Sequence, residues 1–101
     1  MTVGILVTFS CAAEPEELAA LTDEFAGALG DVDGLLSKTW LGIGGGSGGF
    51  YIFRDQAAAD SYLSSPLVDQ LRSHPKLSDF SVQRFDVDEN LSARTRGLPP
   101  A

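Results

Sequence analysis

Residues 34–55 read GLLSKTWLGIGGGSGGFYIFRD. The stretch contains two runs rich in aromatic and β-branched residues, Leu35–Ile43 and 50–53, joined by glycines and one serine. Runs of this kind on either side of glycines are typical of a β-hairpin. The hairpin also holds Trp40, the only tryptophan of the chain, and Tyr51. We therefore expect it to serve both core packing and ligand binding.

The segment before the hairpin predicts a strand and a helix. Residues 2–10 alternate so that Val3, Ile5, Val7 and Phe9 share one face of a strand. Residues 14–29 predict a helix, because apolar residues recur at three- and four-residue steps and acidic residues load its first turn. A short turn through Gly34 then leads into the hairpin.

The segment after the hairpin predicts a second helix and a last strand. Asp55 is placed to cap a helix over Gln56–Leu63, and Pro66 predicts a break before further helical turns to Arg72. Residues 79–87 alternate as a strand. Residues 88–101 form a polar tail with too few apolar residues to pack alone.

The predicted order is βαββαβ, which on about 100 residues is the ferredoxin-like α+β arrangement with a four-stranded antiparallel sheet. We treat residues 1–101 as one domain. Two helices can cover only one face of that sheet. We expect the other face to carry Leu6, Trp40, Tyr51 or their neighbours, and therefore to pack against a second copy of the chain as a homodimer.

Composition narrows the classes of partner. The 101 residues are 44% hydrophobic and 21% charged, as in a globular protein, with a net charge of −7. Such a surface repels phosphate backbones, so we expect no nucleic-acid partner. The apolar first strand lacks a preceding basic residue and is too short to span a bilayer, so we expect neither a signal peptide nor a membrane partner. The single cysteine, Cys11, fits a reducing compartment, and we expect a cytoplasmic protein.

Several motifs resemble the YdhR-like monooxygenase family of the dimeric α+β barrel superfamily, which includes antibiotic-biosynthesis monooxygenases. The resemblance lies in Gly34-Leu35 with Lys38-Thr39-Trp40, in residues 48–55, in Tyr62-Leu63 and in residues 85–92. It implies a homodimer with a pocket between sheet and helices, and a tail that reaches the partner subunit. Related barrels include cofactor-free oxygenases that turn phenolic, anthrone-like polycycles into quinones, and also isomerases, cyclases and haem-degrading enzymes.

Four residues are candidates for catalysis. Trp40 can form a wall for a flat substrate, and Tyr51 can hold a phenol or carbonyl oxygen or shuttle a proton. Lys38 shares a strand face with Trp40 and can stabilise a phenolate or enolate. His74, the only histidine, can act as a base at the pocket mouth. The structural alternatives are a core tryptophan, a tyrosine at a strand rim, a surface lysine and a histidine that ends a helix.

The candidates for substrate contact are Leu6, Thr8, Phe53, Arg84 and Phe85. We expect no metal, because His74 and Cys11 lie far apart and no His/carboxylate spacing occurs. Gly44, Gly46 and Gly49 satisfy G-x-G-x-x-G, but a strand follows where a phosphate-binding loop needs a helix, so we expect no nucleotide.

These observations favour a cofactor-independent monooxygenase that acts on an aromatic or polyketide-like molecule, with O₂ as co-substrate. Two alternatives stay open. One is a cofactor-free isomerase, cyclase or dehydratase in the same pocket, and the other is a small-ligand-binding module without turnover.

Overall fold

Four antiparallel strands form one sheet, in the order β2-β3-β1-β4. The computed structural model describes residues 1–43 and 46–99. The strands are β1 (Val3–Cys11), β2 (Leu35–Ile43), β3 (Gly46–Phe53) and β4 (Leu77–Asp86). The helices are α1 (Pro15–Leu29), α2 (Gln56–Leu63), α3 (Pro66–Arg72) and α4 (Glu89–Arg94). The ferredoxin-like α+β fold is confirmed.

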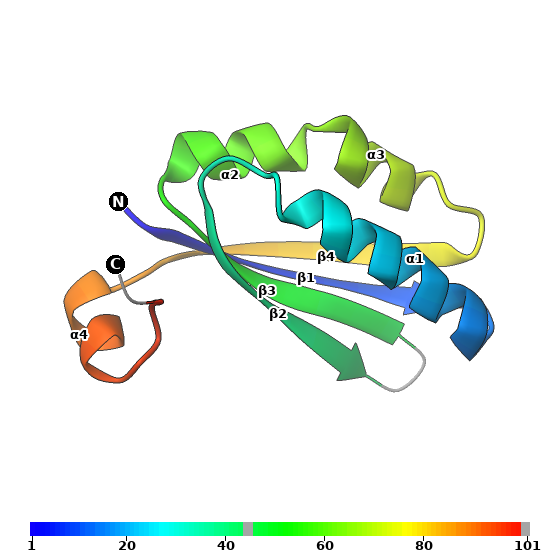
Figure 1. Ribbon diagram of the computed structural model, residues 1–101, viewed down its shortest axis with the longest axis horizontal. Helices are drawn as coiled ribbons and strands as arrows, with labels where there is room; N and C mark the ends of the chain where they lie inside the picture. The colour runs from blue at the N-terminus through cyan, green and yellow to red at the C-terminus, as the bar shows by residue number, and fades with distance from the viewer. Residues whose placement is uncertain (44–45, 100–101) are drawn as a thin grey trace.

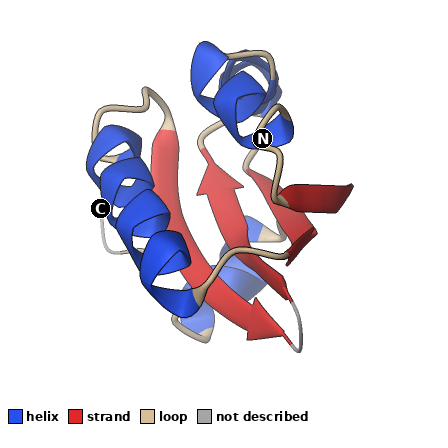
Figure 2. Ribbon diagram, turned by 90° about the vertical axis from the view of Figure 1, so that its right-hand side faces the viewer, coloured by secondary structure: helices blue, strands red, loops and turns tan. Residues whose placement is uncertain are grey.

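Helices α1, α2 and α3 cover one face of the sheet, whereas α4 lies at one end on the opposite side (Figure 1). The view turned by 90° shows the same two layers, with α1 running beside the strands (Figure 2). We call the sheet face under α1, α2 and α3 the helix face, and the other the open face.

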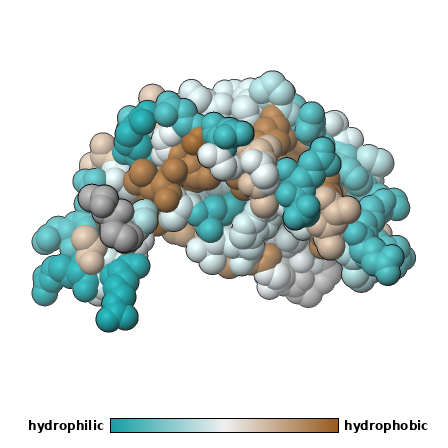
Figure 3. Space-filling model, viewed as in Figure 1, coloured by the Kyte–Doolittle hydropathy of each residue, from teal (hydrophilic) through white to brown (hydrophobic). Residues whose placement is uncertain are grey.

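The core lies between the helix face and the helices. Ile5, Phe53 and Ala59 are completely buried, and Tyr62 is nearly so. Hydrophobic side chains show at the surface along this layer, while the end that carries α4 is hydrophilic (Figure 3).

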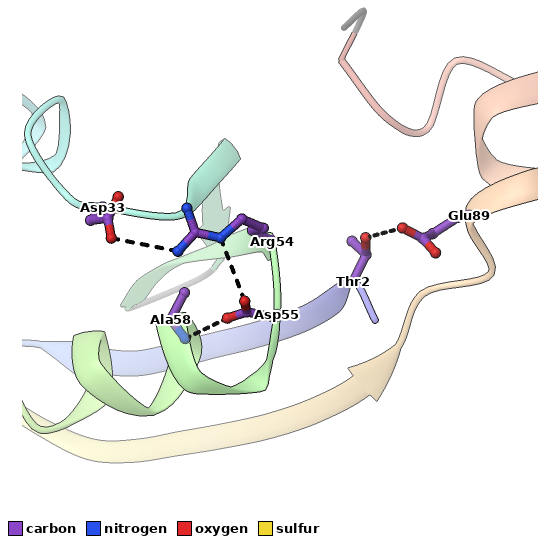
Figure 4. Close-up of polar contacts among 6 residues, drawn as sticks. All are labelled: Thr2, Asp33, Arg54, Asp55, Ala58 and Glu89. Carbon is purple, nitrogen blue, oxygen red and sulfur yellow. Dashed lines mark hydrogen bonds and ion pairs between the residues drawn. The ribbon is translucent and has the colours of Figure 1, made fainter.

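Local capping explains where α2 begins. The Asp55 carboxylate accepts a hydrogen bond from the Ala58 backbone N–H at 2.8 Å, as the sequence predicted (Figure 4). Arg54 lies between Asp33 and Asp55, with both ion pairs at 3.5 Å, and so links the turn before β2 to the end of β3. Both pairs are exposed and therefore stabilise little.

The prediction for the open face was wrong for two of its three residues. Ile5 pairs with Tyr51, and both side chains join the core on the helix face. The Trp40 ring meets Phe25 of α1, so it also lies on the helix face. Only Leu6 lies on the open face. The two largest wholly buried side chains, Ile5 and Phe53, lie on this face beneath the helices.

A register shift between Leu35 and Ser37 changes the predicted faces at the start of β2. Leu35 pairs with Phe53 and packs against the core, whereas alternation placed it opposite Lys38 and Trp40. An irregularity of this kind inserts one unpaired residue, here Leu36, and reverses the alternation around it.

Strand β3 begins at Gly46, four residues before its predicted start. Gly48 lies against β1 so closely that a Cβ atom there would collide with the Val7 carbonyl oxygen. The glycines therefore serve close strand packing. Gly46 and Gly49 of the G-x-G-x-x-G pattern lie in this strand, and Gly44 lies outside the described residues.

The predicted tail contains a short helix. Asp88 caps this helix by accepting a hydrogen bond from the Leu91 N–H at 2.9 Å. The Thr2 hydroxyl donates to Glu89 at 2.6 Å and so links α4 to the residue before β1 (Figure 4). β4 also differs from its prediction, because it begins at Leu77 and ends at Asp86.

Candidate functional site

An apolar pocket lies between the hairpin β2–β3 and helices α1 and α3. We call it the inner pocket. It is lined by Val7, Phe9, Leu18, Leu21, Thr22, Phe25, Lys38, Trp40, Ser47, Gly48, Gly49, Tyr51 and Leu71. The volume open to the centre of a water molecule is about 20 Å³. That is room for about one water, so the inner pocket is nearly closed.

Lys38 occupies the middle of this lining. Its Nζ lies 3.3 Å from the centroid of the Trp40 ring, 4.6 Å from that of Tyr51 and 4.9 Å from that of Phe25. The residue that faces the Lys38 side chain across the hairpin is Gly49, where a Cβ atom would lie 2.5 Å from Lys38 Cε. Because Gly49 has no side chain, the Lys38 side chain can lie across β3 at this position.

Lys38 has no counter-ion in the described part of the chain. The ion pairs found there involve Arg54, Lys76 and Arg84, and no Asp or Glu lines the inner pocket. Burial lowers the pKa of Lys38 from 10.5 to about 8. The surrounding rings favour the ammonium form, but desolvation outweighs them. At neutral pH the ammonium form therefore predominates, with a minor fraction of free amine.

Trp40 separates the inner pocket from an open groove. Its ring meets Phe25 edge to face, with centroids 6.2 Å apart at 85°, yet the residue is 42% exposed. The groove, which we call the outer groove, measures about 630 Å³. It is lined by Pro15, Leu18, Ala19, Thr22, Asp23, Ala26, Trp40, Leu41, Gly42 and Ser47. Trp40 pairs with Gly49 across the hairpin, and the Lys38 side chain occupies the space over this glycine.

Tyr51 forms part of a buried hydroxyl pair that the sequence reasoning missed. The Tyr62 hydroxyl of α2 donates to the Tyr51 hydroxyl at 3.0 Å. Burial raises the pKa of both tyrosines, and the bond to Tyr62 partly offsets this for Tyr51. Both remain protonated at neutral pH, and the Tyr51 hydrogen stays available for another acceptor.

The structure thus brings Lys38, Trp40 and Tyr51 together, and it places the fourth catalytic candidate elsewhere. His74 follows α3, half-buried, and its Nδ1 accepts a hydrogen bond from the Lys76 backbone N–H at 3.2 Å. It does not line the inner pocket. This is the helix-end position that was the structural alternative.

None of the five candidates for substrate contact lines the inner pocket. Phe53 is wholly buried and stacks on Tyr51 at 6.0 Å. Arg84 lies on the helix face and pairs with Asp60 of α2 at 2.6 Å. Leu6, Thr8 and Phe85 lie on the open face, where Phe85 contacts the Phe50 ring.

The lining contains residues that the sequence reasoning did not assign to a site. Leu18, Leu21 and Phe25 form the apolar stripe of α1, and Val7 and Phe9 form one face of β1. Their periodicity predicted the inward-facing side correctly, although only Val7 and Phe25 are fully buried and the other three are half-buried. A pattern of buried positions does not show where a packed layer leaves space, so the signal for a pocket was absent.

In residues 1–43 and 46–99, no group of three or more His, Cys, Asp or Glu side chains could hold a metal ion. No helix in the same residues is long and apolar enough to cross a bilayer.

Solved structures share this architecture. SnoaB from Streptomyces nogalater, described as a cofactor-independent oxygenase, matches with a TM-score of 0.68 and 18% identity, covering 85% of this chain and 92% of that chain. A "putative antibiotic biosynthesis monooxygenase" from Deinococcus radiodurans matches with a TM-score of 0.66 and 18% identity, covering 86% and 92%. Rv0793 from Mycobacterium tuberculosis matches with a TM-score of 0.61 and 22% identity, covering 86% and 95%. At 18–22% sequence identity, these matches show that the chain shares the fold of these proteins.

A comparison with curated protein sequences gives no significant match. A family model, in contrast, matches residues 5–98, which is nearly the whole chain and includes the hairpin, α1 and the inner pocket. The chain therefore belongs to the family described as "Putative mono-oxygenase ydhR".

Proposed function

We propose that the chain is a cofactor-independent monooxygenase that oxidises an aromatic, polyketide-like molecule in the inner pocket. The observation that carries this proposal is Lys38, an amine among three aromatic rings with no carboxylate in the lining. The aromatic rings can stack on a flat substrate. The lysine cation can stabilise the oxyanion that such a substrate forms when it loses a proton.

The reaction needs a base and a stabilised anion, and Lys38 can provide both. With a pKa of about 8, roughly one fifth of Lys38 is neutral at pH 7.4. The free amine takes a proton from a CH₂ group activated by a neighbouring carbonyl or phenol ring, and the resulting ammonium pairs with the enolate oxygen.

Oxygen then reacts with the anion. The carbanion gives one electron to O₂, and the substrate radical and superoxide combine to a peroxide. Protonation and loss of water leave a new carbonyl group. One oxygen atom enters the product, the other leaves as water with the two hydrogens of the original CH₂, and no external reductant is consumed.

Trp40 and Tyr51 have distinct roles in this proposal. The Trp40 ring stacks on the substrate, and the Tyr51 hydroxyl, fixed by the bond from Tyr62, donates its hydrogen to a substrate oxygen. Pockets for such molecules measure about 300–1,000 Å³, far more than the nearly closed inner pocket. Binding therefore requires Trp40 to move so that the inner pocket and the outer groove join.

Oxygen uptake with 1,8-dihydroxyanthrone tests the proposal. We expect uptake above the spontaneous rate, with one quinone formed per O₂. Lys38→Met should lower kcat at least about 100-fold, the contribution typical of a positioned base. Lys76→Met is the matched control, because Lys76 is paired with Glu17 at the surface, and it should leave the rate unchanged.

Binding of the anthrone without oxygen uptake contradicts the oxygenase proposal. Exchange of the CH₂ hydrogens with deuterium under nitrogen then separates the two alternatives. Exchange that depends on Lys38 indicates an isomerase, cyclase or dehydratase, and its absence indicates a binding module.

We further propose that the chain forms a homodimer through its open face, with one inner pocket in each subunit. The corrected open face carries Leu6, Phe50 and Phe85, of which Phe85 is 45% exposed, and also Ile52, which is already buried within the subunit. A groove at one end of this face is lined by both sheet residues and residues 93 and 96–99 of the tail, which supports a contribution of the tail to the proposed interface.

Sedimentation equilibrium tests the dimer. We expect a dimer at micromolar concentration and a shift to monomer for Phe85→Glu. Ala26→Glu, a change on the exposed side of α1, should leave the dimer intact. A wild-type chain that stays monomeric at about 100 μM would overturn this proposal, because its association would then be weaker than about 5.5 kcal/mol.

A further inference from the structure

We propose that Lys38 is also a nucleophile, which forms a reversible imine with the carbonyl carbon of an aldehyde or ketone that enters the inner pocket. The free amine adds to the carbonyl carbon to give a carbinolamine. Loss of water then forms the C=N bond. The step needs neither oxidant nor reductant, and water reverses it.

The first observation is that the amine is free of polar partners in the part of the chain that the structure describes. The chain has only two lysines, Lys38 and Lys76. Lys76 Nζ contacts both carboxylate oxygens of Glu17, at 2.7 and 3.2 Å, whereas Lys38 Nζ lies against aromatic ring faces. An ion pair holds an amine in its charged form, and Lys38 lacks one.

The second observation is that the surroundings favour imine formation. The lining is almost entirely apolar, with room for about one water molecule. An apolar setting that excludes water stabilises the uncharged amine and opposes hydrolysis of the imine. The lowered pKa of Lys38, about 8, follows from the same burial.

The third observation is that Lys38 has a fixed place and a route from solvent. The bare backbone of Gly49 holds the lysine chain across β3, so that Nζ stays near the Trp40 ring. Trp40 also lines the outer groove, and Lys38 is only half-buried. A small flat carbonyl compound can therefore reach Nζ along the edge strand β2 when the indole moves.

Reductive trapping tests the inference on the wild-type chain. The chain is incubated at about pH 7.5 with benzaldehyde and sodium cyanoborohydride, which reduces an imine to a stable secondary amine. Mass spectrometry of peptides then gives the rate at Lys38, at Lys76 and at the amino terminus separately. A lysine of pKa about 8 has roughly 200 times more free amine at this pH than an ordinary lysine. Allowing for restricted access, we expect Lys38 to react at least about tenfold faster than Lys76.

Equal rates at the two lysines, or a faster rate at Lys76, would overturn the inference. A second variant probes the geometry, since Gly49→Ala places a methyl group against Lys38 Cε and should lower the rate at Lys38 alone. If a folded Gly49→Ala chain is labelled at Lys38 at the wild-type rate, then the position of the Lys38 side chain over Gly49 does not control its reactivity. Far-UV circular dichroism confirms folding.

The experiment is independent of the oxygenase proposal. It is run under nitrogen, needs no turnover and uses a substrate that contains no acidic CH₂ group. Loss of oxygen uptake and loss of imine trapping are therefore separate results.

Discussion

Replacing Lys38 with methionine should stabilise the fold while it abolishes activity. Methionine keeps an unbranched chain of similar length, fills the space among the Trp40, Tyr51 and Phe25 rings, and makes favourable contacts between sulfur and aromatic rings. It removes the ammonium, whose burial without a counter-ion costs free energy. A stabilising change that removes function is the signature of a residue kept for its chemistry.

The size of the effect follows from the pKa of Lys38. The value of about 8 in the folded chain lies below the ordinary 10.5 of the unfolded chain. A difference of this size corresponds to about 3 kcal/mol if it is taken in full. Because Lys38 retains partial contact with solvent, we expect a gain of about 1–2 kcal/mol for Lys38→Met at pH 7.

The same difference predicts the pH dependence of the wild-type chain. Between pH 8 and 10.5 the unfolded chain binds more protons at this lysine than the folded chain, so the free energy of unfolding rises with pH. Tyr51 and Tyr62 act in the opposite sense above pH 10, because their raised pKa values keep them protonated in the folded chain while the unfolded chain loses its protons. Stability should therefore peak between about pH 9 and 10.

Urea unfolding followed by far-UV circular dichroism, at steps between pH 7 and 10, measures both effects. Wild type should gain stability up to about pH 9.5, and Lys38→Met should start higher and stay flat to about pH 9, above which the two tyrosines lower its stability. Lys76→Met, the surface control, should keep the wild-type slope. A wild-type curve that is flat or falls between about pH 8 and 9.5 would refute the reasoning, because it would mean that the amine is not destabilised by burial.

Three further changes test the packing around the site. Gly48→Ala should destabilise the fold by about 1–3 kcal/mol in urea unfolding, because the new Cβ atom meets a β1 carbonyl, whereas Gly42→Ala, with open space around it, should cost less than about 0.5 kcal/mol. Tyr62→Phe should cost about 1–2 kcal/mol by the same assay, since it removes the buried donor to Tyr51. Asp55→Ala should cost about 0.5–2 kcal/mol and reduce hydrogen-exchange protection in the first turn of α2.

The sequence predicted the layer architecture because periodicity reports burial directly. The apolar stripe of α1 and the alternation in β1 have the spacing that the structure uses. Alternation also grouped Lys38 with Trp40 correctly, since both follow the register shift at Leu36. Within a stretch of one element that has no register shift, a pattern is enough to say which side chains share a face, whereas the shift at Leu36 made the alternation wrong for Leu35.

What the sequence could not provide was the relation between elements. The assignment of Trp40 and Tyr51 to the open face failed because alternation defines two faces without telling which one the helices cover. The pair of Tyr51 with Tyr62 joins β3 to α2, and no spacing predicts such a contact. Helix α4 was missed because a helix of six residues, capped by Asp88, is too short to show an apolar stripe.

The packing of the layer between the helices and the sheet differs from one end to the other. Near α2 the layer is tightly packed, and Ile5, Phe53 and Ala59 are wholly buried there. Near the end of the hairpin the packing leaves the inner pocket, beside Trp40 at the edge of the sheet. Substitutions that enlarge or reshape the cavity can therefore fall on β2 and α1 while the part that maintains the fold stays intact. A scaffold with this arrangement can change its preferred compound through a few exchanges at one end, at little risk to the rest of the chain.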